Sequence, residues 1–178
     1  MRSSGASPGS PLVRTSAVPW ASRWGYGPGS ACPPRRWTTV PGWNDPALLG
    51  MELPGAGATA SASSLAGLYA AAVTGVEGRE RLLTPDTVTD AVREVSSGTG
   101  WLGFDAGARW GSGFLLDSPF RPMLGRRSFG NDGAGGQFAF GDDEFGVGFA
   151  YVANRMIGHG DARANRLIAA VRECLADG

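Results

Sequence analysis

The chain has 178 residues, of which 42 % are hydrophobic and 18 % are charged. This length suits one domain, and the composition supplies enough apolar side chains for a core. The 16 basic and 16 acidic residues cancel, which argues against nucleic acid or an anionic membrane as a partner, because both select a basic surface. No apolar run approaches the roughly 20 residues of a transmembrane helix, and no secretory signal is recognisable, so we expect a cytoplasmic protein.

All 16 basic residues are Arg, because the sequence contains no Lys. This excludes Lys-containing phosphate-binding loops, Schiff-base enzymes and kinases, since each needs an amine side chain. The one histidine, His159, excludes a site built on two imidazoles, and the two cysteines, Cys32 and Cys174, are too few for a four-thiolate zinc site. We therefore expect neither a metal nor a cofactor.

Residues 1–43 are rich in Ser, Pro and Gly, which predicts an irregular N-terminal segment followed by a folded domain over residues 44–178. Apolar periodicity predicts a first helix over residues 59–74, ended by a glycine. A second helix is expected to start at Thr84-Pro85-Asp86, which offers a capping hydroxyl and a proline in the first turn, and to end near Val95.

The chain then changes to alternating patterns, which predict strands over residues 110–116, 128–130, 137–140 and 145–152. In the last strand, large side chains share one face, and Gly146, Gly148 and Ala150 share the other. A face of small residues lets another element approach closely, and we expect the C-terminal helix, Asp161 to Ala176, to pack there with Asp161 as its cap. The apolar side of this helix consists of Ala164, Leu167, Ile168, Val171, Cys174 and Leu175. The predicted fold class is α+β, an antiparallel sheet flanked by helices.

Two motifs match known sites by their letters alone. Residues 5–9 fit the G-x-S-x-G nucleophile pattern, but they lack a strand and helix around them, and Pro8 has no backbone N–H to donate. Residues 55–60 fit a dinucleotide fingerprint, but Pro54 interrupts the strand that should precede it, so a helix entry is the better interpretation. Acidic residues 142–144 are interpreted as a solvated turn and His159 as a loop residue.

The strongest local signal is the glycine-rich run from Phe129 to Gly136, which begins beside a strand and leads into another. Glycines let a ligand approach the backbone and leave N–H groups accessible to a carbonyl or carboxylate. The pattern alone leaves two interpretations open, a ligand-binding strand edge and a glycine-rich hairpin.

From Asn44 onward the sequence resembles the C-terminal portion of the serine β-lactamase-like hydrolases, which include class C β-lactamases, D-Ala-D-Ala peptidases and related esterases. The likeness lies in a series of segments in the expected order, and the stretch from Asn44 to the end that contains them makes up about three quarters of the chain. These segments are residues 43–46, 52–60, 64–70, 81–88, 110–114, 130–136 and 149–156.

The resemblance implies a partial β-lactamase/transpeptidase-like fold and acyl transfer on a serine. The family places this serine in a Ser-x-x-Lys helix start, supports it with a Tyr-x-Asn or Tyr-x-Ser loop, and lines the substrate with a Lys-Thr-Gly or His-x-Gly strand. Only the last element has a counterpart here, in which Asn131 takes the place of Lys or His, Asp132 and Gly133 follow, and the N–H of Ala134 is one oxyanion donor. No catalytic residue is assigned, and the resemblance implies a truncated chain that is inactive alone, with residues 1–43 unrelated to the family.

Two alternatives stay open. The glycine strand or a sheet edge forms a binding module for a small acyl or peptide ligand or for a partner, or an unusual site near Asn131, with Ser128 or Tyr151 as nucleophile, retains esterase activity. If the chain holds only part of the family's fold, its sheet lacks the elements that would cover it. We therefore also expect exposed apolar surface and self-association.

Overall fold

The computed structural model describes residues 50–51, 53–99, 106–157 and 161–177. The predictions for residues 1–43, for the motif at residues 5–9 and for His159 therefore fall outside the described residues. The chain divides into two compact units, residues 1–60 and 61–178. In the first unit, the N–H groups of Ala56 and Gly57 both donate to the carbonyl oxygen of Leu53, at 3.0 and 2.6 Å. Residues 54–56 are thus a turn, with no preceding strand among the described residues, so a dinucleotide fingerprint has no support here.

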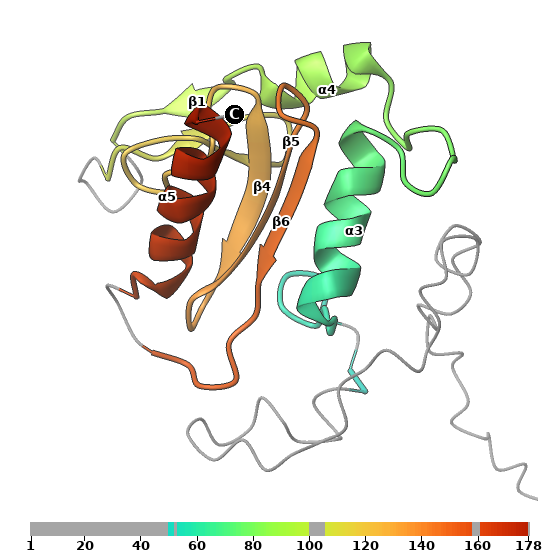
Figure 1. Ribbon diagram of the computed structural model, residues 1–178. Coiled ribbons are helices and arrows are strands. Elements are labelled where there is room, and N and C mark those ends of the chain that lie inside the picture. The colour runs from blue at the N-terminus through green and yellow to red at the C-terminus, as the bar shows by residue number, and fades with distance from the viewer. Residues whose placement is uncertain (1–49, 52, 100–105, 158–160, 178) are drawn as a thin grey trace, which may run out of the picture. The chain divides into compact units, whose positions relative to one another are not determined.

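The second unit contains a six-stranded antiparallel sheet whose strands lie in chain order from β1 to β6 (Figure 1). The two longest strands, β4 and β5, form a six-pair ladder at its centre. The strands are β1 (Ser96–Ser97), β2 (Arg109–Trp110), β3 (Leu115–Leu116), β4 (Ser128–Gly133), β5 (Gln137–Asp142) and β6 (Val147–Tyr151). This arrangement confirms the predicted antiparallel α+β class.

Two helices precede the longer strands, as predicted, although both are shorter than expected. Helix α3 (Ala62–Val73) starts at Ser61, whose hydroxyl oxygen accepts from the Ser64 N–H. It ends before Gly75, whose φ of +81° is the left-handed conformation that glycine adopts most easily. Helix α4 (Pro85–Val92) is capped by the Thr84 hydroxyl, which confirms the predicted start.

The prediction of one strand over residues 110–116 is wrong. The segment folds back on itself as the hairpin between β2 and β3, in which Trp110 pairs with Leu115. The Gly111 N–H donates to the Phe114 carbonyl at 2.8 Å, and Gly113 takes a φ of +84°. The turn can be this tight because a glycine adopts positive φ easily. The alternating pattern of side chains continues through the turn, so it did not indicate one.

The small face of β6 is covered by α3, which corrects the prediction that the C-terminal helix packs there. A Cβ atom added to Gly148 would lie 2.2 Å from the Ala66 carbonyl oxygen and 2.3 Å from the Ala70 nitrogen. The backbone of α3 thus rests directly on the strand. This is possible because small residues line both contacting surfaces, whereas the C-terminal helix carries Ile168 and Val171 on its buried side.

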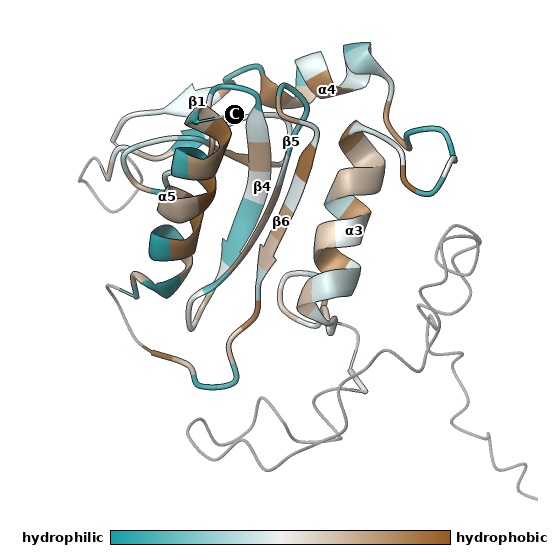
Figure 2. Cartoon of the chain, viewed as in Figure 1, coloured by the Kyte–Doolittle hydropathy of each residue, from teal (hydrophilic) through white to brown (hydrophobic). Residues whose placement is uncertain are grey.

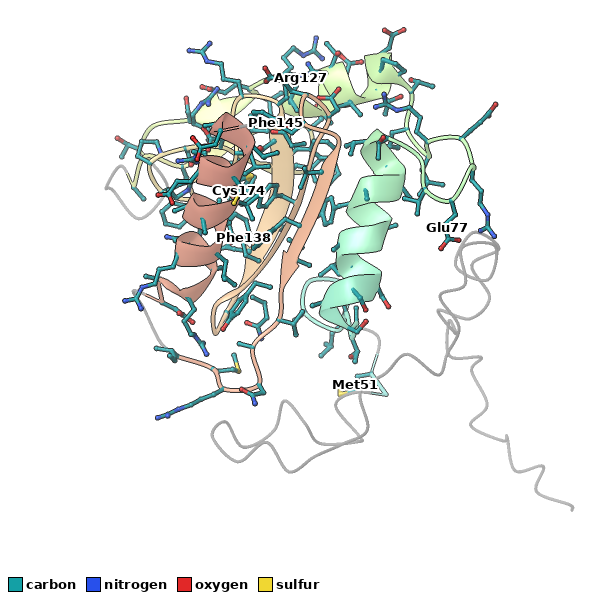
Figure 3. All side chains as sticks on the ribbon, in the orientation of Figure 1. Met51, Glu77, Arg127, Phe138, Phe145 and Cys174 are labelled. Atoms are coloured by element: carbon teal, nitrogen blue, oxygen red, sulfur yellow. The ribbon has the colours of Figure 1, made fainter. Side chains whose placement is uncertain are left out.

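The opposite face of the sheet carries the aromatic side chains of β5 and β6 and is covered by helix α5 (Arg163–Ala176). Figure 2 shows the apolar side of α5 turned toward the strands, and Figure 3 shows Phe138 between this helix and the sheet. Two residues of the predicted apolar side, Leu167 and Cys174, are instead exposed. The residue at the N-cap is Ala162 rather than Asp161. The main core cluster is formed by Leu115, Met123, Leu124, Phe138, Phe140, Ala164 and Ile168.

Candidate functional site

The distal end of β4 is the exposed part of this strand. Its first three residues are buried, whereas Asn131 and Gly133 are exposed and Asp132 is half-buried. The exposure changes along β4 because its neighbour β3 pairs only with Phe129 and Gly130. Beyond that point β4 pairs with β5 alone in the described part of the chain. An extended ligand can approach such an edge through backbone groups.

The two faces of β4 differ at this end. Asp132 pairs across the ladder with Phe138, which packs under α5, so Asp132 lies on the α5 side of the sheet. Its neighbours Asn131 and Gly133 lie on the other side, because side chains alternate along a strand. The Asn131 side-chain oxygen accepts the Asp132 N–H at 3.0 Å. A Cβ at Gly133 would meet only the Gln137 Cβ, at 3.6 Å, so this glycine leaves space open on that face.

A tight turn joins this end of β4 to β5. The Gly136 N–H donates to the Gly133 carbonyl at 3.2 Å, and Gly135 and Gly136 have φ values of +93° and +95°. The backbone N–H of Ala134 has no acceptor among the described residues. Asn131, Asp132, Gly133 and Ala134, the four residues singled out from the sequence, thus lie together on the last part of one strand and the first position of its turn.

Two arginines that the sequence analysis did not assign to the site contact this region from the α5 side. Arg121 donates through Nε to Asp132 Oδ2 at 2.5 Å, and its guanidinium lies 4.9 Å from the centre of the Phe120 ring. Arg163 binds Asp161 at the start of α5 and donates to the Gly135 carbonyl. These contacts join residues 11 and 28 positions apart, so no local spacing signals them.

The Asp161 carboxylate is strongly stabilised in its ionised form. Its side chain is only 6 % exposed. Hydrogen bonds from the Arg163 side chain and then from the Arg163 backbone N–H lower the pKa of Asp161 to about 2, and the Arg121 charge acts in the same direction. The Arg163–Asp161 pair therefore stays charged at neutral pH.

The buried end of the same ladder contains a serine beside a carboxylate. The Ser128 hydroxyl donates to Asp142 Oδ2 at 2.6 Å and accepts the N–H groups of Leu124 and Gly125, both at 3.1 Å. Both side chains are 0 % exposed, so no substrate can reach this hydroxyl. The prediction of a solvated turn for residues 142–144 is therefore wrong for Asp142. It is right for exposed Glu144 only, because Asp143 binds Arg127 at 2.6 Å.

The structure does not bring Ser128 or Tyr151 together with Asn131. Ser128 pairs with Asp142 on the α5 side, and Tyr151 lies on that same side, with its ring 5.7 Å from the Arg163 guanidinium carbon. Asn131 faces the opposite side. In the described ranges, no group of three His, Cys, Asp or Glu residues could hold a metal ion, and no helix is long and apolar enough to cross a membrane. What the described residues offer here is an accessible strand edge with the backbone N–H of Ala134 as a donor, and neither Ser128 nor Tyr151 lies on the same face as Asn131.

The family model described as Beta-lactamase matches residues 14–173. The chain belongs to the beta-lactamase family. The match begins at residue 14, so most of the segment that we expected to be unrelated to the family falls within this beta-lactamase match. A search of curated proteins returned no significant match.

Three solved structures are similar to this chain in both sequence and fold. The esterase EstA from Arthrobacter nitroguajacolicus Rue61a is 33 % identical, with a TM-score of 0.66 over 74 % of this chain and 36 % of that one. A family VIII carboxylesterase is 30 % identical, with a TM-score of 0.63 over the same shares. A penicillin-binding protein homologue from Caulobacter crescentus is 35 % identical, with a TM-score of 0.58 over 68 % of this chain and 34 % of that one. The matched part of this chain spans about a third of their length.

Proposed function

We propose that the β4 edge is the sheet half of an acyl-binding site in a beta-lactamase-family serine hydrolase, and that the 178-residue chain alone does not turn over a substrate. The observation that carries this proposal is the exposed end of β4, where Asn131 and Gly133 share an accessible face. The sequence resemblance aligns these residues with the family's substrate-lining strand. No Lys occurs in the 178 residues, so the chain itself supplies no Ser-x-x-Lys nucleophile.

The proposed ligand is a small ester or a peptide with an extended acyl group. The Ala134 N–H, which has no acceptor in the described part of the chain, is available to a carbonyl oxygen. Gly133 lets the acyl chain lie against the strand without meeting a side chain. Esterases and a penicillin-binding protein homologue are among the similar structures, and acyl compounds connect these two classes.

Absence of turnover follows from the placement of the polar groups. Asn131 carries neither a charge nor a titratable group, so it cannot attract a carboxylate by charge or transfer a proton. Ser128 is the serine of this strand with a carboxylate beside it, but its hydroxyl is sealed in the core. A nucleophile needs both an activating base and access to the substrate.

Intact-mass spectrometry tests the catalytic part of the proposal. The folded chain is incubated with excess penicillin and, separately, with a fluorophosphonate ester, beside a family VIII carboxylesterase as positive control. We expect an adduct on the control enzyme and none on this chain. A stoichiometric adduct on one serine of this chain would mean that a nucleophile is present, and the proposal of an inactive chain would be wrong.

A titration monitored by NMR tests the binding part. A short acyl-D-Ala-D-Ala peptide or a non-hydrolysable ester analogue is added to the wild-type chain and to Gly133→Ala. We expect the amides of residues 131–136 to shift in the wild type, and Gly133→Ala to weaken binding because its methyl group occupies the open face. Gly125→Ala is the matched control, since its Cβ meets nothing within 4 Å. Shifts elsewhere, or equal effects of the two variants, contradict the assignment.

A second candidate function, pairing with another chain, is favoured by the free edge of β6. Within the described ranges β6 pairs only with β5, and residues 145–153 carry no charge. Natural edge strands are usually protected by charges or proline. We propose that a second copy of the chain pairs at this edge. Val152→Lys, at an exposed position beside β6, should then shift the sedimentation profile toward monomer, whereas Val95→Lys near β1 should not.

A further inference from the structure

We infer that Arg163 is a positioning residue that, together with Asp161, holds the glycine turn after β4 in the orientation that presents the accessible edge. The inference rests on the proposed function in one respect, that the end of β4 is the ligand-binding edge. The contacts of Arg163 itself involve only residues outside that edge. It assigns a role to a cluster of charged groups that binding itself does not use.

Arg163 connects three separate parts of the chain. Its Nη2 donates to the Gly135 carbonyl at 3.3 Å and to the Arg155 carbonyl at 2.8 Å, so it links the turn to the segment after β6. Its Nε and Nη2 bind the Asp161 carboxylate at 2.9 and 2.5 Å. A guanidinium can do this because its N–H groups point in several fixed directions in one plane, which an ammonium group cannot reproduce.

The turn also packs directly on the Asp161 side chain, which Arg163 binds, and on Met156. A Cβ at Gly136 would lie 1.9 Å from Asp161 Oδ2, and a Cβ at Gly135 would lie 2.6 Å from Met156 Cγ. The carboxylate that Arg163 binds therefore forms the surface against which the turn rests. If Arg163 no longer fixes Asp161, the turn loses both its hydrogen bond and its support.

All of these contacts lie on the α5 side of the sheet. Arg121 binds Asp132 from that side at 2.5 Å, while Arg163 binds the turn two residues beyond Gly133. The strand end is thus held from one face, and Asn131 and Gly133 remain accessible on the other. Ala134 lies between the two anchored positions. The direction of its N–H depends on the turn, and an oxyanion donor acts only when it lies about 3 Å from the oxygen it stabilises.

A simpler role is that Arg163 and Asp161 only stabilise the start of α5. The Asp161 carboxylate does accept the Arg163 N–H at 3.0 Å near that helix start. On this alternative, removing the guanidinium would loosen α5 and leave the turn unchanged. On our inference, the turn loosens first, and the effect appears at Gly136 and Gln137.

Hydrogen exchange of single amides, followed by NMR on the full chain, separates the two roles. In Arg163→Lys we expect the Gly136 amide, which bonds Gly133, to exchange about tenfold faster or more, the effect of losing a charge-assisted hydrogen bond. The amides of residues 128–130 should not change. Arg166→Lys, at an exposed position one turn further along α5, is the matched control and should leave all of these rates unchanged. Asp161→Asn is the second variant and should loosen the same amides.

Two results would overturn the inference: unchanged exchange at Gly136 and Gln137 in both Arg163→Lys and Asp161→Asn, or faster exchange spread evenly over the sheet. Titration with the acyl-D-Ala-D-Ala probe then examines the proposed function separately. If the wild type binds, Arg163→Lys should weaken binding about tenfold; if the wild type does not bind, the proposed function fails, while the exchange data still decide the role of Arg163.

Discussion

Two aspartates on the same face of the β4–β5 ladder, Asp132 and Asp142, have opposite surroundings. Asp142 is 0 % exposed, and its carboxylate accepts the Ser128 hydroxyl and the N–H groups of Glu144 and Phe145. The Asp132 side chain is 23 % exposed and binds one partner, Arg121. One end of the ladder is therefore closed by a hydrogen-bonded core network, and the other remains open to solvent.

The difference shows that residue type alone does not identify a functional acid. A serine beside a carboxylate looks like a catalytic pair, yet at the closed end each of these groups is fully hydrogen-bonded and inaccessible. The open end has less notable side chains but a free strand edge. Accessibility, rather than reactivity, is therefore the reason for our proposal that the open end binds a ligand.

The largest expected effect comes from removing the buried carboxylate. Asp142→Ala leaves the Ser128 hydroxyl and two backbone N–H groups without an acceptor, at a cost of about 1–3 kcal/mol each. We expect the free energy of unfolding to fall by about 3 kcal/mol or more, measured by urea denaturation. The matched variant at the open end, Asp132→Ala, removes a partly exposed ion pair and should cost less than about 1 kcal/mol. Equal losses would remove the contrast between the two ends.

The Ser128 hydroxyl should be the next most important group. Ser128→Ala removes the acceptor for the Leu124 and Gly125 N–H groups and one donor to Asp142. The expected loss is about 1–3 kcal/mol, while Ser97→Ala, at an exposed position, should change stability by less than about 0.5 kcal/mol. The opposite result would be a wild-type chain that fluorophosphonate labels and a Ser128→Ala variant that is equally stable but no longer labelled. Ser128 would then be a nucleophile and not a core residue.

The sequence predicted the type and order of most elements but not the contacts that distinguish the two ends. The start of α4 was predictable because the Thr84 cap and Pro85 act locally. The hairpin at Gly113 was missed because alternation continued through a turn. The burial of Asp142 depends on pairing with Ser128, and Arg121 and Arg163 reach the site across long sequence separations. Such contacts exist only after the sheet has formed, so no local pattern encodes them.

The loss of stability in acid should depend in part on Asp161, whose side chain supports the turn at the open end. Its pKa is lowered to about 2 in the folded chain, against 3.8 as the ordinary value. The stability it contributes is therefore fully present above about pH 4 and is lost as the pH falls from there toward 2. Urea unfolding between pH 2.5 and 5 should show a smaller pH dependence in Asp161→Asn than in the wild type. Parallel curves for the two proteins would contradict the lowered pKa.

The smallest effect on stability is expected at Asn131, the residue at the centre of the open end. Its side chain is exposed and bonds only the N–H of the next residue among the described contacts. Asn131→Ala should therefore change the free energy of unfolding by less than about 0.5 kcal/mol, measured by urea denaturation beside Asp142→Ala. A loss above about 2 kcal/mol would place Asn131 in the structural core, and the open end would then lose its claim to be a binding edge. If Asn131→Ala instead leaves the free energy of unfolding unchanged but weakens binding of the acyl probe, folding and binding depend on different parts of one strand. The buried half of β4 would then hold the sheet together, and the exposed half would remain available to a ligand.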